Sequence, residues 1–359
     1  MKELLKNLTI TKTENPKEKP DPATLGFGEV FTDHMFIMDY AVEKGWYDPR
    51  IVPYGPIALD PAAAVLHYAQ EMFEGLKTYA AVDGGLNLFR PDMNAKRTNA
   101  TNARICLPLV DEVLYVESIK ALIEIDKDWA PDYPGTSLYI RPFIFASEPF
   151  LGVRPANEYK FVVILSPVGP YYKGGLQPTK IYVEDKYTRS AEGLAGNAKI
   201  GGNYAMSLKA QVEAQEKGYM QVLWLDGRER RYVEEIGTSN AFFMIDGEAF
   251  TAPLTGTILP GITRDSVITL LKDRGVNVRE ERFTIDDVYS ASDAGKLGEV
   301  FATGTAAVIS PVGEMMWKDR KLLVNNGEIG PVSQSLYDDI TGIQSGRLPD
   351  PYGWTIKVE

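Results

Sequence analysis

Short segments rich in β-branched and aromatic residues recur through the first half of the chain and predict β-strands. Two of them flank the sequence Asp-Gly-Gly, which favours a hairpin because such residues accept the tight turn between antiparallel strands. The strands are expected at residues 34–41, 78–82, 86–90, 137–147 and 158–168. The first half is therefore expected to contain a sheet.

Apolar residues follow a helical spacing between these strands. The longest such segment covers residues 60–77, and we expect Asp60 to cap the helix and Pro61 to occupy its first turn. Two further helices are predicted at residues 92–105 and 111–127. The inward face of the first helix would carry Val65, Tyr68, Ala69, Met72 and Phe73.

The second half has its own alternation of strands and helices, and Asp-Gly turns follow residues 225 and 245. We expect helices at 204–217, 263–274 and 331–342, and strands at 221–226, 231–235, 241–246, 249–253 and 299–303. This mixture of hairpins and helices predicts an α+β fold with largely antiparallel sheets.

Proline and glycine interrupt the periodicity near residues 166–180, which places a domain boundary at about residue 170. Two domains are expected because a chain of 359 residues exceeds the size at which a single core stops growing. We therefore expect an N-terminal domain over 1–170, with a surface arm over 1–25, and a C-terminal domain over 171–359.

Composition narrows the class of partner. A formal net charge of -11 at pH 7 argues against nucleic acid and anionic membranes, which both require a basic face, and favours a small-molecule partner. Cys106 is the single cysteine, and His34 and His67 lack metal-ligand spacing. No apolar run has the length of a signal peptide or a membrane span. We expect a cytoplasmic protein that binds no metal.

One lysine stands out because of its surroundings. Residues 193–205 read GLAGNAKIGGNYA and place Lys199 among four glycines, whose backbone can approach a ligand closely. The segment is not a P-loop, because the lysine follows alanine and precedes isoleucine. Taken alone, Lys199 is either a surface charge or a lysine that forms a Schiff base.

An acidic residue lies at the end of a predicted strand in the second half. VEEIGTSNAFF, residues 233–243, places Glu235 directly before Gly237 and Thr238. From this segment alone, Glu235 is either a solvated acid at a strand end or a carboxylate that faces a cavity.

Two glycine-containing turns have backbone suited to an anion. In TGTILPGITRDS a Pro-Gly turn leads into a helix whose first N–H groups include those of Ile262 and Thr263. FATGTAAV, residues 301–308, has a glycine-threonine turn after a predicted buried strand. Both turns also occur in proteins without a ligand.

These segments, together with MFEGLK at 72–77, LFRP at 88–91 and the LYIRP sequence that contains Tyr139 and Arg141, give the chain a family resemblance. The chain resembles the branched-chain amino-acid aminotransferases of the fold-type IV class of pyridoxal-phosphate enzymes, from about residue 30 nearly to the C-terminus. The resemblance implies an N-terminal α/β domain, a C-terminal pseudo-barrel domain and a homodimer.

The resemblance also assigns cofactor contacts. Lys199 would bind the cofactor aldehyde covalently, Tyr204 would bond its phenolic oxygen, and Glu235 would pair with the pyridine nitrogen. The phosphate would be bound by Arg90, Ile262, Thr263 and Thr305.

By the same resemblance, the enzyme would exchange amino groups between L-leucine, L-isoleucine or L-valine and 2-oxoglutarate. Arg141 at the edge of an aromatic pocket would bind the distal carboxylate of glutamate. From their spacing alone, however, Tyr68 and Phe73 suit packing in the core on one face of a helix. The pocket would be formed by Tyr68, Phe73, Tyr139, Arg141, Thr238 and Ala306.

Two alternatives stay open from the sequence. One is a D-amino-acid aminotransferase or an enzyme of the aminodeoxychorismate lyase type on the same fold, against which the LYIRP and MFEGLK segments argue. The other is a phosphate- or nucleotide-binding protein without catalytic activity, which would leave Lys199 and Glu235 unexplained.

Overall fold

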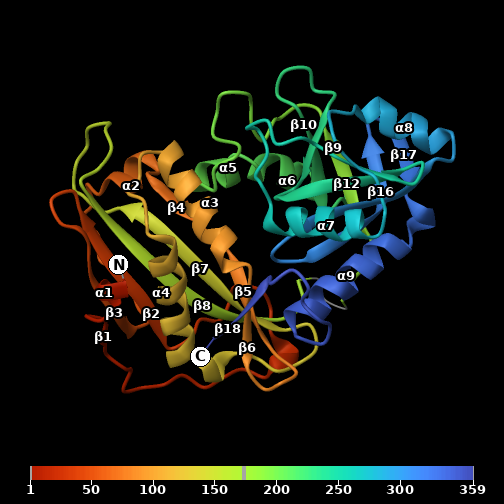
Figure 1. Cartoon of the computed structure of the whole chain (residues 1–359). Helices are drawn as coiled ribbons and strands as arrows, with labels where there is room; N and C mark the ends of the chain where they lie inside the picture. The colour runs from red at the N-terminus through yellow and green to blue at the C-terminus, as the bar shows by residue number, and fades with distance from the viewer. Residues whose placement is uncertain (1, 172–174, 359) are drawn as a thin grey trace. The chain divides into compact units, whose positions relative to one another are not determined.

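The computed structural model describes residues 2–171 and 175–358 of the chain. The chain divides into two units, and Figure 1 labels their helices and strands. The first unit contains Met1–Tyr171, Ala198–Gly201 and Gly342–Glu359, and the second contains Tyr172–Asn197 and Gly202–Thr341. Lys199 therefore belongs to the first unit, although the residues on both sides of its short segment belong to the second.

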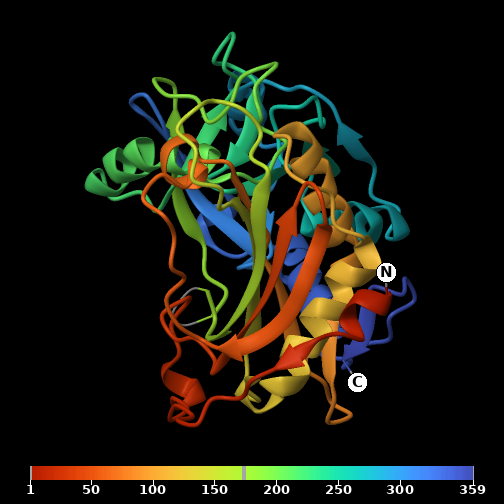
Figure 2. The same ribbon diagram turned by 90° about the vertical axis from the view of Figure 1, so that its left-hand side faces the viewer.

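The first unit is built on a sheet of nine strands among its described residues, in the order β1-β3-β2-β8-β7-β5-β6-β18 with β4 beside β7. All pairs are antiparallel except β1 with β3. Figure 2 shows β2 and β3 as long neighbouring strands in orange-red. The strands are β1 (Thr9–Ile10), β2 (His34–Ala41), β3 (Gly45–Pro53), β4 (Glu71–Phe73), β5 (Leu76–Ala80), β6 (Leu86–Phe89), β7 (Ser137–Ala146), β8 (Glu158–Val168) and β18 (Thr355–Val358). The five strands predicted in this half are confirmed.

Two helices, α3 (Pro91–Arg104) and α4 (Glu112–Ile125), cover one face of this sheet (Figure 1). Asp111 caps the second of them by accepting a hydrogen bond from the Leu114 N–H at 2.9 Å. Leu114 and Ile119 are buried on this helix and belong to the same apolar core as Phe161 of β8. The helices of the unit are α1 (Lys2–Leu5), η1 (Pro22–Thr24), α2 (Ala64–Tyr68), α3 (Pro91–Arg104), α4 (Glu112–Ile125) and η2 (Lys127–Trp129).

The long helix predicted over residues 60–77 is wrong. The helix α2 ends at Tyr68 because Ala69 adopts a left-handed conformation with φ 49°, and β4 then pairs with β7. Strand periodicity places Met72 in the core and Glu71 and Phe73 on the opposite face. Apolar residues at these positions satisfied both patterns, and pairing with a neighbouring strand decided between them.

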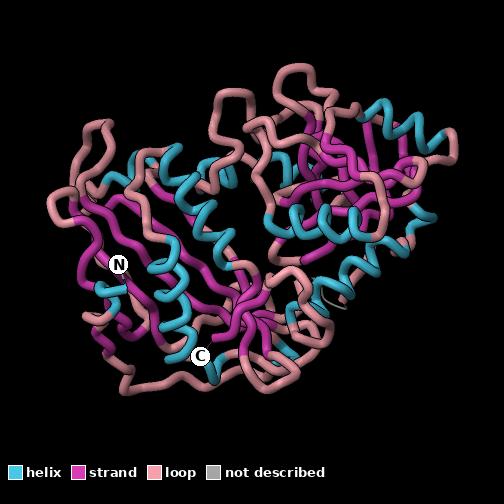
Figure 3. Tube along the Cα trace, viewed as in Figure 1, coloured by secondary structure: helices cyan, strands magenta, loops and turns pink. Residues whose placement is uncertain are grey.

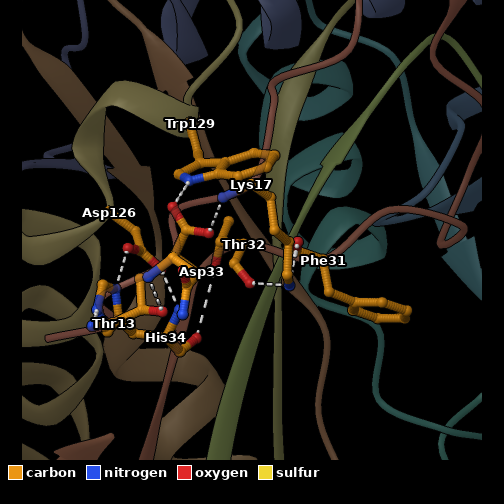
Figure 4. Close-up of polar contacts among 9 residues, drawn as sticks. Thr13, Lys17, Phe31, Thr32, Asp33, His34, Asp126 and Trp129 are labelled. Atoms are coloured by element: carbon orange, nitrogen blue, oxygen red, sulfur yellow. Dashed lines mark hydrogen bonds and ion pairs between the residues drawn. The ribbon is translucent and has the colours of Figure 1, made fainter. Parts of the chain in front are cut away.

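Residues 13–17 of the N-terminal segment form hydrogen bonds with side chains at the start of β2, as Figure 4 shows. His34 Nδ1 lies 2.7 Å from Asp126 Oδ1, and its Nε2 accepts the Thr13 N–H at 2.9 Å. Asp33 accepts the Lys17 N–H at 2.9 Å. These bonds attach the backbone of residues 13–17, most of which are exposed, to the start of β2.

The second unit contains a closed ring of six strands, in the order β11-β10-β9-β16-β15-β12, that is completed by pairing of β11 with β12. β13 and β14 extend from β12, and β17 pairs with β16. The α+β class and the pseudo-barrel are thereby confirmed. The strands are β9 (Thr179–Glu184), β10 (Gln221–Leu225), β11 (Val233–Ile236), β12 (Ser239–Ile245), β13 (Glu248–Thr251), β14 (Val278–Glu280), β15 (Leu297–Gly304), β16 (Val308–Trp317) and β17 (Arg320–Leu323).

Helices surround the strands of this unit, as the cyan and magenta tubes of Figure 3 show. The single helix predicted over 204–217 is two helices, α5 and α6, and the predicted helices near 263–274 and 331–342 are confirmed as α7 and α9. None of the described helices has the length and apolar character needed to cross a membrane. The helices are α5 (Gly201–Ala205), α6 (Leu208–Glu216), α7 (Ile262–Asp273), α8 (Ile285–Asp293), η3 (Asn325–Gly327) and α9 (Pro331–Gln344).

Candidate functional site

The segment that carries Lys199 is bonded to two elements of the first unit. The Lys199 carbonyl accepts a hydrogen bond from the Phe73 N–H of β4 at 3.1 Å. The Lys199 N–H donates to Thr101 Oγ1 of α3, also at 3.1 Å. Two residues later, the Gly201 N–H donates to Glu71 Oε1. The backbone on both sides of the lysine is therefore fixed against β4 and α3.

The ring of Phe73 lies beside two cations. The Lys199 Nζ is 4.8 Å from the ring centroid, and the Arg141 guanidinium carbon is 4.7 Å from it. Aromatic faces attract cations at such distances. Arg141 also donates a hydrogen bond of 2.9 Å to the Tyr139 hydroxyl. The first unit thus brings Lys199, Phe73, Tyr139 and Arg141 together.

The residue that follows Phe73 belongs to a buried ion pair. Glu74 is completely buried, and its two carboxylate oxygens accept hydrogen bonds from Arg97 at 2.7 and 2.8 Å. Asn94 donates a third bond at 2.7 Å. Burial raises the pKa of Glu74, but the charge and hydrogen bonds of Arg97 outweigh burial, so that the pKa lies below its ordinary value. The Lys199 charge acts in the same direction.

The MFEGLK segment shapes the wall beside Tyr139. A Cβ atom on Gly75 would lie 2.1 Å from the Tyr139 hydroxyl oxygen, so only glycine allows this close approach. Lys77 pairs with Tyr139 across β5 and β7, and burial lowers its pKa to about 8. Phe27 also contacts Tyr139, and the centroids of the two rings lie 5.0 Å apart.

Arg90 has an unusual backbone conformation for its residue type. It precedes α3 with φ 49°, in the left-handed region, which costs about 1–3 kcal/mol for a residue other than glycine. Its N–H donates to the Trp354 carbonyl at 2.7 Å, and its guanidinium carbon lies 5.2 Å from the centroid of the Trp354 ring. The C-terminal segment of the chain therefore fixes Arg90.

Tyr68 has different surroundings from the other predicted pocket residues of its unit. It lies on α2 with 36% of its surface exposed, and its hydroxyl donates to the Leu151 carbonyl. That carbonyl belongs to an exposed segment after β7. The expectation that Tyr68 packs in a core is wrong, because the helix that would have buried it ends at this residue.

In the second unit, Glu235 is buried and paired. Only 1% of its surface is exposed, so the alternative of a solvated acid at a strand end is excluded. The Arg189 Nη1 lies 2.8 Å from Glu235 Oε2. Asn240 donates one hydrogen bond to Glu235 Oε1 at 3.1 Å and another to the Leu259 carbonyl at 2.9 Å. Asn240 thus connects the carboxylate to the loop that precedes α7.

Several predicted residues of the second unit lie at one end of the barrel. Strand pairing sets Glu235 opposite Asn240, and Asn240 opposite Thr303, so the ends of β11 and β15 and the start of β12 meet there. The turn after β11 contains Thr238, which is exposed, and the turn after β15 contains Thr305 and Ala306, which are half-buried.

The start of α7 adjoins this end of the barrel through Asn240. Ile262 and Thr263 lie in its first turn, and the residue before them, Gly261, has no side chain with which to cap the helix. The N–H groups of a first helical turn have no acceptor within the helix and are suited to an anion. Tyr204 lies on α5, five residues after Lys199, and is half-buried.

Sequence reasoning missed the residues that support the predicted ones. Arg189 and Asn240 support Glu235, Trp354 supports Arg90, and Glu71 supports the lysine segment. Arg189, Trp354 and Glu71 come close to the residues they support only through the fold, whereas Asn240 lies in the same segment as Glu235 and faces it across the β11–β12 hairpin. Within residues 2–171 and 175–358, no group of three His, Cys, Asp or Glu residues is placed to bind a metal ion.

Comparison with known proteins finds a family model and relatives that match the chain. A model of the class IV amino-transferases matches residues 71–315. Branched-chain-amino-acid aminotransferase 2 of Bacillus subtilis (strain 168) is 57% identical over 351 residues, which cover 98% of this chain and 97% of that protein.

Solved structures agree with this similarity. The crystal structure of Escherichia coli branched-chain amino acid aminotransferase matches with a TM-score of 0.77 and 28% identity, over 91% of this chain and 99% of that one. The crystal structure of the T.th. branched-chain amino acid aminotransferase with pyridoxamine 5'-phosphate matches with a TM-score of 0.75 and 29% identity, over 90% and 98% of the two chains.

Proposed function

The chain belongs to the class IV aminotransferase family, and from this premise we propose that it transfers amino groups between L-leucine, L-isoleucine or L-valine and 2-oxoglutarate. The products are the branched 2-oxo acids and L-glutamate. The observation that carries this proposal is the identity of 57% with a branched-chain-amino-acid aminotransferase over nearly the full length of both chains.

The cofactor is pyridoxal 5'-phosphate, and the chemistry of the available donors fits it. The chain has an amine on Lys199, a buried carboxylate whose charge Arg189 compensates, and a helix start without a side-chain cap. When bound, this cofactor accepts the electrons left on the substrate Cα after its proton is removed. We assign its binding to Lys199, Arg90, Tyr204, Glu235, Ile262, Thr263 and Thr305.

Each of these residues has a role that follows from its chemistry. Lys199 would attach the cofactor, and its Nζ, once the substrate amine takes its place, would remove the Cα proton of the amino acid in one half-reaction and deliver a proton to the Cα of the 2-oxo acid in the other. Glu235 would pair with the ring nitrogen and hold a proton there, for which its ion pair with Arg189 supplies a fixed orientation. Arg90 would bind the phosphate as a guanidinium fork, together with the first N–H groups of α7.

We assign substrate binding to an apolar pocket with one cationic edge. Phe73 and Tyr139 would contact the branched side chain, and Arg141 would bind the distal carboxylate of glutamate or 2-oxoglutarate. The contacts of Arg141 with both rings support this assignment, because they hold a guanidinium beside aromatic walls. The full set is Tyr68, Phe73, Tyr139, Arg141, Thr238 and Ala306.

We also propose a homodimer that works in the cytoplasm. Exposed apolar side chains gather around α2 and the segment after β7, namely Leu66, Phe150, Leu151 and Val153. An apolar patch of this kind is typical of a surface that another protein covers, and a second copy of the chain is the partner we propose. Sedimentation of the purified protein at dimer mass would support this assignment, and a monomer would contradict it.

The function is tested by single-turnover absorption spectroscopy. We expect purified protein to absorb visible light near the blue region, to lose this band when L-leucine is added, and to regain it with 2-oxoglutarate. Lys199→Ala is the control and should show no turnover. Faster turnover of D-alanine than of L-leucine would contradict the proposal and assign the chain to a D-amino-acid aminotransferase.

A further inference from the structure

Glu71 lies beside the lysine segment and has no role in the chemistry described above. It occupies the first position of β4, two residues before Phe73, and the two side chains therefore project from the same face of the strand. Met72 between them points into the apolar core. Residues 199–201 are bonded to β4 through the Phe73 N–H and the Glu71 side chain.

The contact between Glu71 and the segment is short and depends on a glycine. The Gly201 N–H donates to Glu71 Oε1, and a Cβ atom at Gly201 would lie 2.4 Å from the same oxygen. Any larger residue at 201 would therefore displace the carboxylate. A hydrogen bond from an amide to an ionised acceptor is about twice as strong as a neutral one.

The charge of Glu71 also lies near the pocket guanidinium. The pKa of Glu71 lies above its ordinary value, because the effect of burial exceeds the opposite effects of the Gly201 amide and of the positive charge of Arg141. Arg141 contacts the ring of Phe73, which the lysine amine also contacts. Glu71 is therefore an anchor for the segment at a place where the lysine amine and the Arg141 guanidinium share one aromatic ring.

From this geometry we propose that Glu71 is a positioning residue for the Lys199 amine. Two anchors on β4, the Phe73 N–H and the Glu71 carboxylate, hold the carbonyl of Lys199 and the N–H of Gly201. With its backbone held at these two points, the lysine extends its side chain across the Phe73 ring. The consequence for catalysis rests on the proposed function, but the anchoring itself does not.

The anchor is tested first without reference to activity. Hydrogen–deuterium exchange at the Gly201 amide is measured in the full-length chain, both as purified and after removal of the cofactor. We expect Glu71→Ala to speed exchange by about tenfold or more, since it removes a bond to a charged acceptor. Glu71→Gln keeps an oxygen acceptor and should stay within about threefold of the parent. Met72→Leu, on the opposite face of the same strand, is the matched control and should leave Gly201 unchanged.

Kinetics test the consequence. We expect Glu71→Ala to lower kcat with L-leucine by about tenfold or more while KM stays within about threefold, and Glu71→Gln to restore most of kcat. Unchanged Gly201 exchange in Glu71→Ala overturns the anchor, and faster exchange with unchanged kcat overturns the positioning role. A parent protein without turnover of L-leucine contradicts the proposed function instead, and the exchange experiment still decides on the anchor.

Discussion

Arg189 and Glu235 form a buried ion pair, with the guanidinium Nη1 2.8 Å from the carboxylate Oε2. We expect Arg189→Met to destabilise the protein by about 3–5 kcal/mol, because it removes the positive charge that is paired with a buried carboxylate. Urea unfolding measures this loss. Arg189→Lys should recover part of it, and the double variant Arg189→Met with Glu235→Gln should be more stable than Arg189→Met alone. Equal stability of Arg189→Met and the parent would contradict the pairing.

Glu235→Gln alone tests the chemistry at the same place. Glutamine has nearly the shape of glutamate but lacks its charge, so kcat should fall more than cofactor affinity. Stopped-flow absorption gives the rate of the half-reaction with L-leucine, and a fluorescence titration of the cofactor gives its affinity. An unchanged rate would remove Glu235 from the reaction.

Trp354 is expected to affect cofactor retention through Arg90. Trp354→Leu removes the aromatic face on which the guanidinium lies, a contact worth about 0.5–2 kcal/mol, and should weaken cofactor binding by about 2- to 30-fold. Trp354→Phe keeps an aromatic face and serves as the control. Extended dialysis followed by absorption spectroscopy measures retention, and equal retention in the leucine variant and the parent would refute the link.

Glu74 is expected to stabilise the first unit in a pH-dependent way. Its pKa in the folded protein lies below the ordinary 4.5, so its contribution is present above about pH 4.5 and is lost as pH falls toward the folded-state value. Glu74→Gln should therefore cost about 3–5 kcal/mol at pH 7, and less as the pH is lowered. Unfolding titrations at several pH values measure the difference.

A surface pair in the same unit supplies the control for that experiment. Glu124 and Lys127 are exposed, and the Lys127 Nζ lies 2.9 Å from Glu124 Oε1. Glu124→Gln should lower the free energy of unfolding by no more than about 1 kcal/mol at pH 7. If both variants lost the same amount of stability, burial of the Glu74 pair would not be the cause.

Arg141→Met should separate the two half-reactions. In the proposed pocket, loss of the guanidinium would leave the distal carboxylate of 2-oxoglutarate without a partner, whereas the side chain of L-leucine has no charge to pair. We expect kcat/KM to fall by about tenfold or more with 2-oxoglutarate and by less with L-leucine. Arg154→Met removes a more exposed arginine of the same unit and should change neither value. Equal losses in both half-reactions would retract the role of Arg141.

The sequence predicted the strands that have a continuous apolar character, such as 137–147 and 158–168, because burial on both sides of a sheet leaves few alternatives for them. It failed over residues 60–77, where the apolar positions suited a helix as well as a strand. The observed helix ends at Tyr68 because Ala69 adopts a left-handed conformation, which an alanine in the sequence does not predict.

For the candidate site, the local motifs predicted Lys199 and Glu235 as site residues but not the side chains that surround them. Glu71 and Thr101 reach the lysine segment from far earlier in the chain, and Arg189 reaches Glu235 from a distant part of the second unit's sequence. Such contacts depend on strand order, which the sequence pattern of one segment does not contain. Side chains that hold a functional residue in place are therefore the part that only a structure supplies.

The pairing of β18 with β6 has a consequence for synthesis of the protein. β6 is translated early, whereas β18 and Trp354 belong to the C-terminal segment, and the whole second unit is made between them. At about 5–20 residues per second, a ribosome needs roughly 15–50 s to cover that distance, during which one edge of the first sheet has no neighbour. An unpaired edge strand is a template for pairing with another chain, so β6 is open to such pairing until β18 has been made.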